Sequence, residues 1–181
     1  MKVLIITGSP HANGTSSYLA KQFMKGAKDK GHEVNLVDAG NLQIRGCLGC
    51  NYCRSHGDVC IQNDKMADIM PYVLEADLIL LSSPVYIMGP SAQLKTFLDR
   101  FYVSFLELRK MHKKWALIMT CNDQTTTVLA PSQSFFHVLM DHLGWESYAE
   151  IYAQGYNTKE DVMNSKYATE AYQCGYSLAL S

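Results

Sequence analysis

Segments whose hydrophobic pattern predicts a strand alternate with segments whose pattern predicts a helix, along the whole chain. Five segments rich in apolar and β-branched residues are predicted to be strands, at residues 3–6, 34–37, 77–82, 115–120 and 145–153. Apolar residues recur at helical spacing after each of them. This alternation predicts an α/β fold, with a five-stranded parallel sheet covered by helices on both faces.

Apolar positions three and four residues apart define the expected helical faces. The first helix is expected to use Thr15 or Ser16 as its N-cap, because a small-residue turn ends there. In the fourth helix, the spacing predicts a buried face made of Phe135, Val138 and Leu139.

Residues 41–63 interrupt this pattern. The stretch has no clean period and carries four cysteines and three glycines. Loops of this length inside a compact domain are usually functional. We therefore interpret it as a Cys-rich insertion within a single domain that covers residues 1–181.

Composition narrows the class of protein. A chain of 181 residues with 48% hydrophobic residues is large enough for one domain with a real core. The net charge of −1 offers no basic surplus for nucleic acid. No apolar stretch reaches the roughly 18 residues of a membrane span, and the first apolar run is too short for a signal peptide. We expect a cytoplasmic protein without membrane or nucleic-acid partners, whose cysteines need an explanation other than disulfides.

The loop GSPHANGTSS, which follows the first strand, has the features of an anion site. A strand, a small-residue loop and a helix start bring free N–H groups and the positive end of the helix dipole together. The loop lacks the Gly-Lys-Ser/Thr ending of a Walker A motif and the G-x-G-x-x-G of a dinucleotide fingerprint. Its hydroxyls suit a terminal phosphate monoester, and the alternative is an ordinary βα turn with a Ser/Thr cap. The loops after strands 1, 3 and 4 share one sheet edge if the strand order is 2-1-3-4-5.

Three segments together resemble a known family. GSPHANGTSS, ADLILLSSPVYIMGPSAQLKTFLDR and the TCN turn are similar to the NAD(P)H-dependent FMN reductases of the flavodoxin superfamily. The resemblance implies a flavodoxin-like three-layer sandwich with the strand order 2-1-3-4-5. It also implies an FMN-dependent oxidoreductase that takes electrons from a nicotinamide cofactor, NAD(P)H. The electrons would pass to a quinone, another small acceptor or an Fe–S cluster.

The same resemblance assigns residues to the flavin. The FMN phosphate would be held by Ser9, His11, Thr15, Ser16 and Ser17. The isoalloxazine ring would be lined by Pro84, Val85, Tyr86, Ile87, Met88 and Gly89. The pyrimidine edge would meet Cys121, Asn122 and Asp123. His11 departs from the family, whose members usually carry Arg there. Simple packing is the alternative role of Tyr86 and Cys121, and no side chain is assigned as a catalytic acid or base.

The insertion contains the pattern C-x2-C-x2-C-x6-C, formed by Cys47, Cys50, Cys53 and Cys60. Three close repeats with a fourth cysteine are typical of a cluster held by four thiolates, and the segment resembles the iron–sulfur flavoproteins within the family. Three hypotheses account for the four cysteines: a [4Fe–4S] cluster, free or redox-active thiols, or a zinc site. We expect the cysteines near the carboxyl edge of the second strand, on the flavin side of the sheet.

Two other classes of function are compatible with the sequence. One is a non-enzymatic flavodoxin-like electron carrier, and the other is a binding module that senses redox state through its cysteines. The apolar residues Tyr102, Val103, Phe105 and Leu106 exceed what one core face needs. Such a surplus commonly marks an interface, so we expect a homodimer or homotetramer.

Overall fold

The computed structural model describes residues 1–179 of the chain. Five parallel strands form the main sheet: β1 (Lys2–Thr7), β2 (Glu33–Asp38), β3 (Leu78–Tyr86), β5 (Lys114–Cys121) and β6 (Glu146–Gln154). Their order across the sheet is β2-β1-β3-β5-β6, which confirms the predicted 2-1-3-4-5 order. A short additional strand, β4 (Gly89–Pro90), pairs antiparallel with the end of β3, and the sequence does not predict it.

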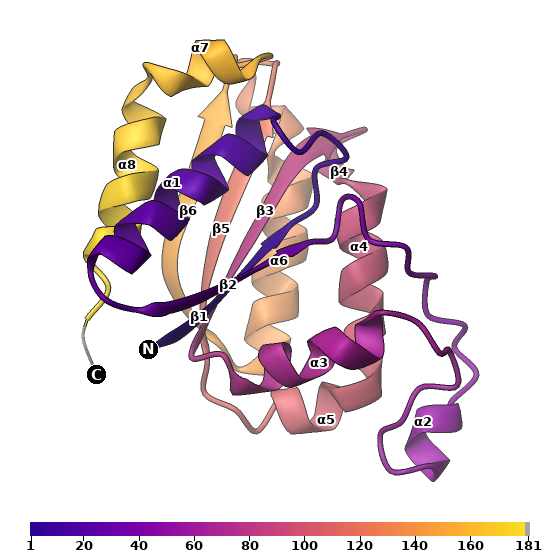
Figure 1. The fold of residues 1–181 in the computed structure, drawn as a ribbon. Coiled ribbons are helices and arrows are strands. Elements are labelled where there is room, and N and C mark those ends of the chain that lie inside the picture. The colour runs from indigo at the N-terminus through magenta and orange to yellow at the C-terminus, as the bar shows by residue number, and fades with distance from the viewer. Residues whose placement is uncertain (180–181) are drawn as a thin grey trace.

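Helices cover both faces of this sheet (Figure 1). The α-helices are α1 (Thr15–Asp29), α2 (Tyr52–Ser55), α3 (Met66–Glu75), α4 (Ala92–Asp99), α5 (Phe105–Leu108), α6 (Ala130–Leu143), α7 (Lys159–Met163) and α8 (Lys166–Tyr176). Two 3-10 turns, η1 (Arg100–Ser104) and η2 (Thr126–Val128), complete the set. Helices α1 and α8 lie on one face, and α3, α4 and α6 lie on the other. The predicted three-layer arrangement is confirmed.

The strands contribute alternate residues to two separate cores. Leu4 and Ile6 of β1 point into the core beneath α3, α4 and α6. Val3 and Ile5 point into the core beneath α1 and α8. Because both faces of the strand are buried, every position must be apolar, which explains the continuous apolar run.

Helices α1 and α8 approach each other at backbone distance. A Cβ atom on Gly26 would lie 2.0 Å from the carbonyl oxygen of Tyr172. A Cβ atom on Gly175 would lie 2.1 Å from the carbonyl oxygen of Phe23. Glycine inside a helix lowers its intrinsic stability. Here the two glycines are required because no larger residue fits between the helices.

Two predicted details of the helices are wrong. Helix α1 begins at Thr15 with Gly14 as its N-cap, and no side chain caps it. In α6 the prediction fails for Val138, which is 66% exposed, while Phe135 and Leu139 are half-buried against the core. The fully buried apolar residues of the face include Phe136 and Met140, because apolar residues occupy adjacent positions and the tertiary contacts shift the centre of the face by one residue.

The apolar stretch after α4 is not part of one long helix. Helix α4 ends at Asp99, and the chain continues through η1 into the short α5. Val103 is buried, while Tyr102 and Leu106 remain exposed. Within residues 1–179, no helix is both long and apolar enough to cross a membrane.

Candidate functional site

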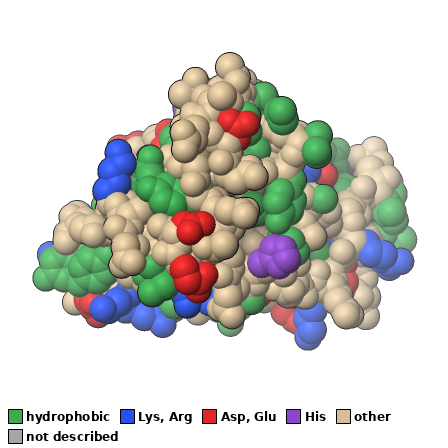
Figure 2. All heavy atoms as spheres, turned by 90° about the horizontal axis from the view of Figure 1, so that it is seen from above, with side chains coloured by type: hydrophobic (Ala, Val, Ile, Leu, Met, Phe, Trp, Pro, Cys, Tyr) green, Lys and Arg blue, Asp and Glu red, His purple; other side chains and the backbone are tan. Residues whose placement is uncertain are grey.

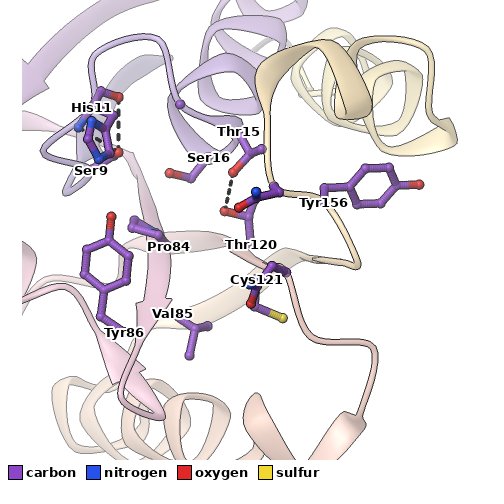
Figure 3. Close-up of a pocket in the computed structure, with 13 residues that line it drawn as sticks. Ser9, His11, Thr15, Ser16, Pro84, Val85, Tyr86, Thr120, Cys121 and Tyr156 are labelled. Atoms are coloured by element: carbon purple, nitrogen blue, oxygen red, sulfur yellow. Dashed lines mark hydrogen bonds between the residues drawn. The ribbon is translucent and has the colours of Figure 1, made fainter.

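A cavity of about 350 Å³ opens at the carboxyl edge of β1, β3 and β5. Its walls are formed by Ser9, His11, Gly14, Thr15, Ser16, Pro84, Val85, Tyr86, Thr120, Cys121, Asn122, Tyr156 and Asn157. The structure therefore brings together the three loops that the sequence singles out, as Figure 3 shows. Seen from above in Figure 2, this end of the molecule is largely backbone and uncharged polar groups, with acidic side chains and a histidine near the middle, hydrophobic side chains between them, and Lys and Arg toward the rim.

One end of the cavity is the start of α1. The first N–H groups of a helix have no partner within the helix, so the amides of Thr15 and Ser16 are free to face an anion. The Ser16 side chain has no hydrogen-bond partner among the described residues, although the residue is only 1% exposed. Thr15 Oγ1 is 2.8 Å from Thr120 Oγ1, which fixes the helix start against the end of β5. Unpaired donors at a helix start are the groups that a phosphate monoester requires.

The loop before α1 is held by its own hydrogen bonds. The Ser9 hydroxyl lies 3.1 Å from both the N–H and the carbonyl oxygen of His11. Gly14 N–H donates to the same carbonyl oxygen at 2.9 Å. The hydroxyl of Ser17 also donates to it, at 3.2 Å. Ser17 therefore supports the loop and does not line the cavity, which differs from its predicted role as a phosphate contact.

The second loop contributes an apolar and aromatic wall. Pro84, Val85 and Tyr86 line the cavity along the end of β3. Ile87 and Met88 do not, because they form the two-residue turn between β3 and β4, with φ values of 47° and 60°. Both side chains are exposed, Ile87 to 97%. Gly89 is also absent from the lining, so only half of the predicted ring-binding segment faces the cavity.

The third loop contributes Cys121 and Asn122 but not Asp123. Asp123 Oδ1 accepts hydrogen bonds from the N–H and the hydroxyl of Thr125, at 2.7 and 2.8 Å, which lowers the pKa of its carboxyl group. Cys121 Sγ donates to the carbonyl oxygen of Asp123 at 3.2 Å, and burial raises the pKa of this thiol. Cys121 is thus a neutral thiol at neutral pH, and Asp123 shapes the turn that presents Asn122.

Sequence reasoning missed four residues of the lining: Gly14, Thr120, Tyr156 and Asn157. Tyr156 and Asn157 follow β6, which neighbours β5, so the rule that ligands sit beyond the carboxyl ends of the strands could have found them. The complete cavity has unpaired donors at one end, a flat apolar wall, and a polar turn opposite. These features fit a flavin mononucleotide, whose ring is flat and amphipathic and whose phosphate is terminal.

The four cysteines of the insertion line one hollow of about 20 Å³. Cys53 is buried and Cys60 half-buried, while Cys47 and Cys50 are exposed, and all four are free thiols. Two of the sulfur atoms already accept hydrogen bonds, Cys47 from Gly49 N–H at 3.5 Å and Cys60 from an Arg100 N–H at 3.4 Å. In the described part of the chain, no three His, Cys, Asp or Glu side chains are arranged to hold a metal ion. The chemistry of the donor set, four thiols from one loop lining one hollow, fits a cluster held by four thiolates.

An ion pair lies directly beside this hollow. Arg100 is 2% exposed and forms a salt bridge of 2.6 Å with Asp64. Burial disfavours both charges, but the hydrogen bonds and attraction between them outweigh it. The pKa of Asp64 is therefore lowered and the pKa of Arg100 is raised. The pair stays charged over the whole neutral range.

The expectation that the cysteines lie on the flavin side is wrong. The insertion leaves β2, runs past α4 and places α2 away from the carboxyl edge of the sheet (Figure 1). The hollow lies against η1, after the C-terminal end of α4, whereas Ser91 at the other end bonds to Gly8 of the first loop. Eight residues of helix separate these ends by about 12 Å, and the hollow and the cavity share no lining residue.

Among curated proteins, the chain is similar to several iron-sulfur flavoproteins. One from Archaeoglobus fulgidus is 38% identical over 100 residues, which cover 55% of this chain and 45% of that protein. Another, from Methanocaldococcus jannaschii, is 37% identical over 100 residues, which cover 55% of this chain and 51% of that protein. The matched region thus spans about half the length of these curated relatives.

Among solved structures, the fold is shared with several reductases and oxidoreductases. An NAD(P)H:quinone oxidoreductase from Methanothermobacter marburgensis superposes with a TM-score of 0.79 at 17% identity, covering 100% of this chain and 97% of that one. An FMN-dependent NADH-azoreductase from Bacillus anthracis, solved in complex with FMN, gives a TM-score of 0.72 at 15% identity, with 97% and 98% covered. At these identities the superpositions establish the shared fold.

The match to a family model is more extensive than the matches to the curated relatives. The model of the family described as NADPH-dependent FMN reductase matches residues 1–155, which is most of the chain. The match confirms the resemblance read from the sequence, and with it FMN and NAD(P)H as the cofactors that characterise the family. The chain therefore belongs to the NADPH-dependent FMN reductase family.

Proposed function

We propose that the protein is an FMN-dependent oxidoreductase that takes electrons from NAD(P)H and passes them to a quinone, another small acceptor or an Fe–S cluster. The observation that carries this proposal is the cavity at the carboxyl edge, where a helix start, an apolar wall and a polar turn converge. When bound, FMN supplies the hydride and single-electron chemistry, and the protein supplies binding and orientation. The family match and the names of the relatives support the assignment.

The first task of the chain is to hold the phosphate. The free amides at the start of α1 and the hydroxyl of Ser16 would donate to it, and Ser9 keeps the preceding loop in shape. His11 would add a ring nitrogen at the rim of the same cavity. Hydrogen bonds to a charged acceptor are roughly twice as strong as neutral ones, so this end would dominate the affinity.

The second task is to orient the ring. Pro84, Val85 and Tyr86 would pack against one face and exclude water from it, since an aromatic or apolar wall matches a flat ring. Asn122, presented by the turn that Asp123 stabilises, would supply polar groups at the edge of the ring. These residues bind and orient, and none of them needs to act as an acid or base.

Turnover with purified protein tests the function. The protein is expected to oxidise NADH or NADPH in the steady state when a soluble quinone is supplied, and the flavin it releases should elute as FMN in chromatography. FAD in place of FMN, or no flavin after reconstitution, would contradict the proposal. Reduction only by a ferredoxin-like partner, with no NAD(P)H oxidation, would identify an electron carrier instead. A cysteine-dependent change of binding partner without turnover would identify a redox sensor.

The cysteines extend this proposal. We propose that Cys47, Cys50, Cys53 and Cys60 hold a [4Fe–4S] cluster, because four thiols from one loop line one hollow and the curated relatives are named iron-sulfur flavoproteins. All six cysteines of the chain are free. Free thiols persist where the surroundings are reducing, and we propose the cytoplasm as the compartment.

A homodimer or homotetramer is the expected assembly. Three exposed apolar side chains line the cysteine hollow, namely Leu48, Ile61 and Tyr102, and exposed Val59 lines the neighbouring groove. A groove of about 410 Å³ between α3 and η1 continues this surface. Contiguous apolar surface on a soluble protein commonly marks an interface. Light scattering at micromolar concentration should give at least twice the mass of one chain, and a monomer with flavin bound would contradict the expectation.

A further inference from the structure

One buried cation joins the two ends of the Cys-rich insertion. Arg100 of η1 donates to both carboxylate oxygens of Asp64, at 2.6 and 3.1 Å, and to the carbonyl oxygen of Arg45 at 2.9 Å. Arg45 N–H in turn donates to Asp64 at 3.4 Å. Arg45 precedes the cysteines and Asp64 follows them, so a single guanidinium holds the two ends of the cysteine loop together. We call these two ends, residues 45–46 and 62–64, the neck of the loop.

A second buried side chain, that of Gln62, also links the two ends of the loop, one residue further along the chain from Arg45. Gln62 is 5% exposed, and its Nε2 donates to the carbonyl oxygen of Gly46 at 2.9 Å. Arg45 and Gly46 are consecutive, so the backbone is held immediately before Cys47. The segment from Cys47 to Cys60 therefore starts and ends at fixed points.

Arg100 also reaches the sulfur of the fourth cysteine. Its Nη2 lies 3.4 Å from Cys60 Sγ, and both residues line the hollow that the four cysteines share. A guanidinium presents its donors in a rigid planar fork. The same group thus sets the neck of the loop and the position of one sulfur atom, and it brings a buried positive charge to that sulfur.

We propose that Arg100 is the positioning residue of the cysteine site. It closes the neck of the insertion and donates a hydrogen bond to Cys60, so that the four sulfur atoms are held around one cluster. This proposal rests on the proposed [4Fe–4S] cluster. Hydrogen bonds and positive charge beside cluster sulfurs favour the reduced state, so Arg100 should also raise the reduction potential of the site.

The test uses the full chain with Arg100→Gln and Arg100→Lys. The matched control is Lys95→Gln, which removes a positive charge from an exposed ion pair with Asp99 on α4 and does not touch the insertion. Amide hydrogen exchange over residues 41–63 is measured on metal-free protein. Iron content and the reduction potential, followed by EPR, are measured on protein loaded without oxygen.

Arg100→Gln is expected to speed exchange in the insertion at least tenfold, to reduce iron content and to lower the potential of any cluster that remains. Arg100→Lys should restore part of each effect, and Lys95→Gln should match the wild type. Wild-type exchange in Arg100→Gln, or a loaded site with wild-type potential, overturns the proposal. If the wild-type protein binds no iron and Arg100→Gln still exchanges faster than the wild type, the result supports the neck closure and rejects the cluster.

FMN binding reports whether each variant is folded, because the flavin cavity and the cysteine hollow share no residue. If Arg100→Gln fails to bind FMN, Arg100→Lys decides the question by the same measurements. A lysine keeps the charge but cannot bridge Asp64, Arg45 and Cys60 at once. Wild-type exchange and potential in a folded Arg100→Lys would then overturn the positioning role.

Discussion

Protein expressed and purified without oxygen is expected to contain about four iron and four sulfide atoms per chain. The reason is that one short loop supplies four thiols to a single hollow, and two of the sulfur atoms already accept hydrogen bonds. Iron and sulfide analysis with a low-temperature EPR spectrum after reduction measures the cluster. Because Cys47 and Cys50 are exposed, a cluster there is vulnerable to air, and the anaerobic sample is the decisive one.

Cys50→Ala should abolish this iron content and the EPR signal, since one of four ligands is lost. Cys174→Ala is the matched control, because Cys174 is a free, half-buried thiol on α8 that takes no part in the hollow. The control should keep the full iron content. Fewer than one iron per chain in the wild type would reject the cluster, as would a Cys50→Ala protein with unaltered iron.

Ser16→Ala is expected to weaken FMN binding by about 10- to 150-fold, which corresponds to the roughly 1.5–3 kcal/mol of a hydrogen bond to a charged group. The hydroxyl of Ser16 has no partner among the residues described, and it lies at the start of α1 where the phosphate is expected. Titration of flavin-free protein with FMN, followed by flavin fluorescence, measures the change.

Ser17→Ala is the matched control for this prediction. It removes the same hydroxyl one residue along α1, but that hydroxyl donates to the His11 carbonyl oxygen and does not face the cavity. Its effect on affinity should therefore be smaller than that of Ser16→Ala. Wild-type affinity in Ser16→Ala would mean that the phosphate is not held at this helix start.

The sheet and the place of the cavity could be predicted because their signals are long and repeated. A run such as residues 78–81 must be buried on both faces, and a parallel sheet is the architecture that buries it. Once the strands are ordered, their carboxyl ends must meet at one edge. Ser9, Tyr86 and Cys121 therefore reach the same cavity although they lie far apart in sequence.

The directions of side chains in short turns could not be predicted in the same way. Ile87 is exposed because it lies in the two-residue turn between β3 and β4, and the sequence alone does not reveal that β4 exists. Asp123 turns into its own loop because Thr125 offers two donors. The path of residues 41–63 has no periodicity to follow, and it is set by the buried contacts of Arg100, which lies far along the chain.

The glycine contact between α1 and α8 has a consequence for the order in which the molecule can be assembled during synthesis. Helix α1 is made directly after β1, whereas α8 is made only after β6, when all strands of the sheet already exist. Until α8 is made, the strip of α1 around Gly26 lacks the helix that covers it in the complete fold. Exposed apolar surface on a growing chain is prone to aggregation. The packing of α8 against α1 can therefore occur only after β6 has been made. A nascent chain halted after β6 is expected to bind chaperones.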